Sequence, residues 1–89
     1  MKPSIREELL SELFARGFTT RGASPRDTMI LDETYLGDVD IAELLELMVA
    51  RREKIFRSQD VVGADAAKAS YDDVLLVIEA IKAVIGRYI

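Results

Sequence analysis

The segment DAAKASYDDVLLVIEAIKAVIGRY, residues 65–88, decides the fold of this chain. One apolar stripe along it advances by alternating steps of four and three residues, as the inward positions of packed helices do. This stripe consists of Ala67, Tyr71, Val74, Ile78, Ile81, Ile85 and Tyr88. A second stripe covers much of the opposite face and consists of Leu76, Ala80 and Ala83, with Val77 and Val84 between the two stripes. A helix that is apolar on all sides is normally buried on all sides, so the pattern predicts a helix that also contacts a partner molecule.

Self-association is the simplest source of that second contact. The chain has 89 residues, which we take as a single helical domain over residues 1–89, and a domain of that size buries only about 60–65% of its unfolded surface. It has no Cys for disulfides and no His for an imidazole metal site, so oligomerisation is the remaining way to add stability. We therefore predict a homo-oligomer, a dimer or higher, whose interface comprises Leu76, Val77, Ala80, Ala83 and Val84.

A capping box predicts where the first helix begins. Ser4 precedes Glu7 by three residues, and in this motif each side chain accepts a hydrogen bond from the backbone N–H of the other residue. Apolar residues at helical spacing follow, and Gly17 supplies the left-handed conformation that ends many helices. We predict a short N-terminal helix over residues 4–16. Residues 17–39 are rich in Thr, Ser, Gly and Pro, and we expect them to form a long ordered loop held to the core by its apolar side chains.

The second helix is predicted over residues 40–60. Asp40 occupies a capping position with Glu43 three residues later, and Gly63 interrupts the helical pattern before Asp65 caps the third helix. The apolar stripe of the second helix consists of Ile41, Leu44, Leu45, Met48, Val49, Ile55 and Phe56. Because only a few residues link the second and third helices, they should form an antiparallel hairpin. The predicted fold is all-α: a short N-terminal helix, a long ordered loop and a hairpin of two long helices, assembled as a homo-oligomeric helical bundle.

Charge and composition exclude several classes of function. Twelve Lys and Arg against sixteen Asp and Glu give a net charge of −4, which argues against binding to duplex nucleic acid because that requires a concentrated basic face. No apolar run reaches the roughly 18 residues of a membrane span, so we expect no membrane partner. The start MKPSIREELL lacks the apolar core of a signal peptide, and we expect a cytoplasmic protein.

The absence of Cys and His also limits the chemistry. It excludes nucleophilic catalysis by Cys/His or Ser/His pairs, acid/base catalysis by histidine, and zinc fingers. The acidic residues Asp32, Glu33, Asp38 and Asp40 lack the alternating ligand spacing of a calcium loop, and no glycine-rich phosphate-binding motif occurs. We therefore expect no enzymatic activity, no catalytic residue, no cofactor and no metal.

Two groups of residues are candidates for binding. The first is the basic cluster Arg51, Lys54 and Arg57 near the end of the second helix, which suits a carboxylate, a phosphate or an acidic partner helix. Basic residues in the last turns also complement the helix dipole, so a structural explanation competes. Arg52 lies on the apolar stripe of its helix, and we expect it to be partly covered and paired with Asp72 or Asp73. The second group, in the loop, comprises Thr20, Arg21, Ser24 and Arg26.

Two hypotheses about function follow. The first is a non-enzymatic interaction protein, a small regulator, adaptor or inhibitor, which forms a homo-oligomer through the third helix and binds another protein. The alternative is an oligomeric protein that binds or sequesters an anionic small molecule, such as a nucleotide, at a subunit interface. Arg21 and Arg26 motivate the alternative, because two chains would pool guanidinium groups that one chain lacks.

Overall fold

The structure is a computed structural model, and it describes residues 2–18, 37–58, 60 and 63–88. Its main elements are the helices α1 (Pro3–Ala15), α4 (Ile41–Arg57) and α6 (Ala64–Tyr88). Every stretch of regular structure within these described residues is helical, so the all-α prediction is confirmed. The predicted loop between the first and second helices lies mostly outside the described residues.

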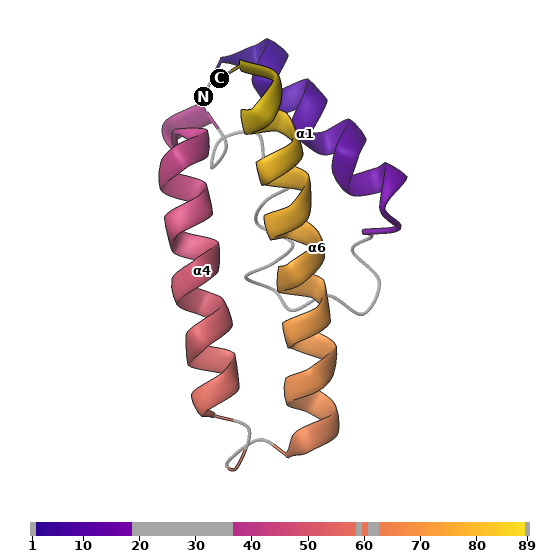
Figure 1. Ribbon diagram of the computed structural model, residues 1–89, viewed down its shortest axis with the longest axis vertical. Coiled ribbons are helices and arrows are strands. Elements are labelled where there is room, and N and C mark those ends of the chain that lie inside the picture. Colours follow the sequence, from indigo (N-terminus) through magenta and orange to yellow (C-terminus); the bar gives the residue numbers. More distant parts are fainter. Residues whose placement is uncertain (1, 19–36, 59, 61–62, 89) are drawn as a thin grey trace.

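The three helices pack around α6 (Figure 1). α4 lies beside α6 along most of its length and runs in the opposite direction, while α1 crosses the C-terminal half of α6. The core between them is built from apolar side chains of all three helices. Its buried members are Leu9, Leu13, Phe18, Leu44, Met48, Ile55, Ala67, Val74, Val77, Ile78, Ala80, Ile81 and Val84. Among the described residues, no helix is both long enough and apolar enough to cross a lipid bilayer.

The start of α1 differs from the prediction. The helix begins at Pro3 rather than Ser4, Lys2 occupies the capping position, and the capping residue makes no side-chain hydrogen bond. Proline suits the first turn because its φ is already helical and the N–H that it lacks would have no partner there. Pro3 therefore extends the helix past Ser4, and the predicted capping box between Ser4 and Glu7 is wrong.

The end of α1 follows the prediction closely. Gly17 adopts a left-handed φ of 84°. The Phe18 N–H donates to the Leu13 carbonyl over 2.9 Å, and the Gly17 N–H donates to the Phe14 carbonyl over 3.1 Å. This pair of bonds is a Schellman cap, in which the residue after the glycine contacts the last turn of the helix. Phe18 and Leu13 are both buried, so the cap also contributes to the core.

The caps of α4 and α6 are made by backbone atoms. Asp40 occupies the predicted capping position of α4, but its side chain makes no capping hydrogen bond; its carbonyl accepts from the Leu44 N–H over 2.8 Å. At α6, the Gly63 carbonyl accepts from the Ala67 N–H over 3.1 Å, and Gly63 has a φ of 92°. Asp65 therefore lies in the first turn of α6 and does not cap it, which corrects the prediction.

The burial of α6 corrects the predicted oligomer interface. Val77, Ala80 and Val84 have 0% exposed area in the single chain, because they belong to the core that α6 shares with α1 and α4. They are therefore not available to a second copy. Leu76 and Ala83 remain half-buried. Three of the five predicted interface residues are thus covered within the single chain, and self-association stays a prediction.

Candidate functional site

A pocket opens between the C-terminal half of α4 and the N-terminal half of α6. The two helices run in opposite directions, so the basic end of α4 lies beside the first turns of α6 (Figure 1). The pocket has a volume of about 360 Å³. It is lined by Arg52, Glu53, Phe56 and Arg57 from α4 and by Tyr71 from α6.

The lining combines aromatic rings with guanidinium groups. Phe56 is 63% exposed, so its ring is accessible to a partner. Arg52 is half-buried, as its place on the apolar stripe predicts, and Tyr71 is half-buried on the facing helix. Arginine and aromatic side chains dominate the residues that carry binding energy in protein interfaces. A guanidinium beside an aromatic ring also offers a planar surface for stacking.

Electrostatics leave the pocket mildly basic. Arg57 forms an ion pair with Glu53 at 3.8 Å, but their side chains are 81% and 62% exposed. Such a pair between neighbouring turns contributes only about 0.3–0.5 kcal/mol, so a carboxylate from a partner competes with Glu53 at little cost. Lys54 and Arg57 both lie in the last turn of α4, where their charges also complement the carbonyl end of the helix dipole.

The structure brings together only part of the predicted binding set. Arg57 lines the pocket, Lys54 is exposed on the same helix, and Arg51 is half-buried. The loop residues of the prediction lie outside the described residues; they are Thr20, Arg21, Ser24 and Arg26. The predicted pairing of Arg52 with Asp72 or Asp73 stays a prediction.

Sequence reasoning missed the aromatic half of the pocket. The apolar pattern of α4 assigned Phe56 to the buried stripe together with Ile55. Consecutive residues lie about 100° apart around a helix, so only one of the two can point into the core. Ile55 is buried, and Phe56 therefore points outward. Tyr71 was assigned to the packed stripe of α6, and nothing in the sequence places it beside Arg52 and Phe56.

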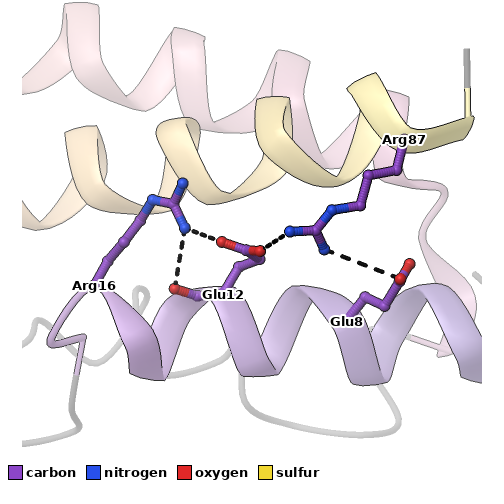
Figure 2. A network of polar contacts seen from close by, with 4 residues as sticks. All are labelled: Glu8, Glu12, Arg16 and Arg87. Atoms are coloured by element: carbon purple, nitrogen blue, oxygen red, sulfur yellow. Dashed lines mark hydrogen bonds and ion pairs between the residues drawn. The ribbon is translucent and has the colours of Figure 1, made fainter.

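A second polar cluster joins α1 to the end of α6 (Figure 2). The Glu12 carboxylate accepts hydrogen bonds from Arg16, one turn further along α1, and from Arg87 in the last turn of α6. Arg87 Nη1 also lies 4.0 Å from Glu8 Oε1, and Arg16 Nη1 lies 3.5 Å from the Glu12 carbonyl. The hydrogen bonds from Arg16 and then Arg87 lower the pKa of Glu12. This cluster holds charges of both signs in contact and fixes α1 against α6.

Tyr88 extends that cluster. The neighbouring Glu8 carboxylate raises the pKa of the Tyr88 hydroxyl, so the phenol stays protonated. The only sequence signal for the cluster is the spacing of Glu12 and Arg16, which are four residues apart on one helix face. The role of Arg87 depends on how α1 docks against α6, so the sequence does not reveal it. The cluster is a structural clamp that holds these two helices together.

Comparison with known proteins adds no functional assignment: no family model, no curated protein and no solved structure matches this chain. Within the part of the chain that the structure describes, no group of acidic side chains is arranged to hold a metal ion. Among the described residues, the pocket at the end of α4 combines exposed aromatic and basic side chains suited to binding.

Proposed function

We propose that this protein is a non-enzymatic interaction protein, a small regulator, adaptor or inhibitor, which binds another protein through the basic end of α4. The observation that carries the proposal is the pocket, in which two guanidinium groups and two aromatic rings line a single cavity of about 360 Å³. Interface hot spots have this composition, with an aromatic or arginine anchor at the centre. The absence of Cys and His from the sequence supports a binding role over a catalytic one.

The chemistry of the pocket indicates what kind of partner segment fits. Arg52 and Arg57 suit carboxylates, and the exposed ring of Phe56 suits an apolar or aromatic side chain. Ligand pockets span roughly 300–1,000 Å³, so this one is near the lower limit and accommodates one large side chain better than an extended ligand. We expect an acidic segment of the partner to dock with one bulky apolar side chain in the pocket. The cysteine-free composition is compatible with the reducing cytoplasm, where we place the interaction.

Site-specific cross-linking tests the proposal. A photoreactive phenylalanine analogue replaces Phe56, and a matched protein carries it at Phe14, which is 58% exposed on α1. Position 56 should cross-link to a partner in cells of the native host, and position 14 should not. The partner identified in this way is then purified, and its affinity is measured for the wild type, Phe56→Ala and Arg52→Gln.

Each substitution should weaken binding by about tenfold or more, as hot-spot residues do. Circular dichroism should show unchanged helix content, because Phe56 is exposed and Arg52 is not part of the core. If the partner binds both variants as tightly as the wild type, the pocket is not its docking site. If position 56 captures no protein, the interaction proposal fails.

A second candidate function is the binding of an anionic small molecule by an oligomer. The specific observation in its favour is that Arg52 and Arg57 line one cavity together with two aromatic rings, a set suited to a planar anion such as a nucleotide. A thermal-shift screen against nucleotides and phosphorylated metabolites tests it. A ligand at 100 times its Kd should stabilise the wild type by about 2.7 kcal/mol and should not stabilise the double variant Arg52→Gln/Arg57→Gln.

A further inference from the structure

The outward face of α4 has opposite charge at its two ends. Glu43 and Glu46 lie in the N-terminal half, whereas Lys54 and Arg57 lie in the C-terminal half. All four are exposed. Ala50 lies midway between them and is exposed too. The face is therefore acidic at one end and basic at the other, and it carries a small side chain in the middle.

Glu43, Ala50, Lys54 and Arg57 share one stripe of the helix, and Glu46 lies at its edge. Residues 43, 47, 50, 54 and 57 advance by steps of four and three, the spacing that keeps side chains on one face of two packed helices. Leu47, on this stripe, is a large apolar side chain that is 44% exposed. Within the described residues, neither Glu43 nor Glu46 takes part in an ion pair.

We propose that a second copy of this chain packs antiparallel on this face, with the two-fold axis at Ala50. In this arrangement each residue lies opposite the one equally far from Ala50 on the second copy. Glu43 then lies opposite Arg57 of the second copy, and Glu46 lies opposite Lys54 of the second copy. The two-fold repeats both contacts, so the interface is complementary to itself. The small side chain of Ala50 allows the two helices to approach closely at the axis.

Charge selects the antiparallel direction. A parallel pair would place Glu43 against Glu43 and Arg57 against Arg57, and like charges in contact are destabilising. The antiparallel pair replaces these contacts with ion pairs. Leu47 then lies opposite Glu53 of the second copy, next to the apolar stem of Lys54 of the second copy. Glu53 acts against the dimer, because it pairs with Arg57 at 3.8 Å within its own helix and competes with Glu43 of the second copy.

The dimer should be weak and sensitive to salt. One helix face buries less than the roughly 1,200 Å² of a standard stable interface. Ion pairs between exposed side chains contribute little each and are screened as ionic strength rises. This differs from the interface on α6 that the sequence suggests, because Val77, Ala80 and Val84 are buried within the single chain.

Sedimentation of the full chain over a wide concentration range, at low and high salt, tests the proposal. We expect a dimer at low salt that dissociates at about 0.5 M salt, where the screening length is only a few ångströms. Two charge-reversed variants follow: an acidic-end variant, Glu43→Lys/Glu46→Lys, and a basic-end variant, Lys54→Glu/Arg57→Glu. Each alone should dimerise at least about tenfold more weakly than the wild type.

Mixing the two variants provides the decisive measurement. At these four positions the acidic-end variant carries only positive charges and the basic-end variant only negative ones. Every contact between the two copies of a mixed dimer therefore joins opposite charges, and the mixture should dimerise where neither variant does so alone. The quadruple variant Glu43→Lys/Glu46→Lys/Lys54→Glu/Arg57→Glu reverses all contacts together and should dimerise again. The matched control Asp72→Lys/Glu79→Lys makes the same change in net charge as the acidic-end variant, on exposed positions of α6, and should leave dimerisation unchanged.

Several results would overturn the inference. A wild type that sediments as a monomer at every concentration in low salt excludes the dimer. A dimer that both charge-reversed variants form as tightly as the wild type does not use this face. If circular dichroism shows that charge reversal lowers the helix content, the neutral variant Glu43→Gln/Glu46→Gln is used in its place. A neutral variant that dimerises as tightly as the wild type then excludes this face. Arg57 belongs to both the stripe and the partner pocket, so the acidic-end variant, which leaves every pocket residue unchanged, separates the dimer from the partner pocket.

Discussion

Arg87 in the last turn of α6 forms an ion pair with Glu12 of α1, which lies 75 residues earlier in the chain. Glu12 also accepts a hydrogen bond from Arg16, and its side chain is only 16% exposed. One carboxylate therefore joins two guanidinium groups from two helices (Figure 2). The first helix is held in place by the end of the last one.

The clamp makes the docking of α1 depend on pH. The pKa of Glu12 is lowered from its ordinary value of 4.5 by hydrogen bonds from Arg16 and then Arg87. A carboxyl group whose pKa is lower in the folded state stabilises the fold above its unfolded pKa, and this contribution is lost as pH falls through the folded pKa. The difference in the free energy of unfolding between the wild type and Glu12→Gln should thus be largest near neutral pH and should shrink below the ordinary pKa of 4.5.

Urea denaturation at a series of pH values measures that difference. Glu7→Gln is the matched control, since Glu7 is an exposed carboxylate on the same helix. A wild-type advantage over Glu12→Gln that stays constant down to acid pH would show that the clamp does not stabilise the fold through charge.

Removing the other side of the clamp should loosen α1 selectively. Arg87→Gln should lower the free energy of unfolding by about 1 kcal/mol or less, because the ion pairs are partly exposed. Hydrogen exchange should speed up at the amides of α1 more than at those of α4, since only α1 loses its tie to α6. Lys82→Gln, an exposed substitution on α6, should change neither. Equal acceleration in α1 and α4 would mean that Arg87 acts on the whole fold.

Two glycines should respond in opposite directions to the same change. Gly17→Ala should destabilise by about 1 kcal/mol, because a φ of 84° strains any residue with a Cβ. Gly86→Ala should stabilise by up to about 1 kcal/mol, because Gly86 lies within α6, a Cβ there meets nothing within 4 Å, and alanine favours the helix. Thermal or urea unfolding of the two variants measures both shifts. Shifts of the same sign would show that the cap or the helix is assigned wrongly.

Val77 and Leu76 are neighbours on α6, but substitutions at the two positions should differ in their effect on stability. Val77→Asp buries an unpaired charge at a fully buried position and should cost about 4 kcal/mol or more, whereas Leu76→Asp, at a half-buried position, should cost about 1–2 kcal/mol. Leu76→Asp should also leave the sedimenting mass unchanged if copies associate through α4. If Leu76→Asp sediments as a monomer under conditions in which the wild type is a dimer, copies associate through the α6 interface that the sequence suggests.

The sequence predicts the helices well because their signals are local. Helical spacing and Gly17 or Gly63 place each end within a few residues, whatever the rest of the chain does. The predicted capping box is wrong because Pro3, one residue before Ser4, is itself a strong signal for the first turn of a helix. The predicted interface on α6 is wrong at Val77, Ala80 and Val84, because their burial depends on tertiary packing. Whether Val77 is covered by the chain itself or by another copy depends on where α1 docks, and the spacing within α6 does not contain that information.

The candidate site divides in the same way. Arg57 belongs to a cluster of charges that is visible along the sequence, and Arg52 was correctly expected to be half-buried. Phe56 was placed in the core, because an apolar pattern with two adjacent members does not show which one points inward. Tyr71 joins the pocket only through the register between two helices.

The tie between Glu12 and Arg87 also constrains the order in which the chain acquires its structure. Closing a short loop costs less entropy than closing a long one, so the contacts between α4 and α6 should form before α1 docks. During synthesis on the ribosome, Arg87 emerges after all of α1 and α4. Leu9 and Leu13, which α6 helps to bury, therefore stay exposed to solvent until α6 has emerged. We therefore expect α1, the first helix in the sequence, to be the last of the three to dock. In a nascent chain stalled before residue 87, the apolar face of α1 would be exposed to chaperones.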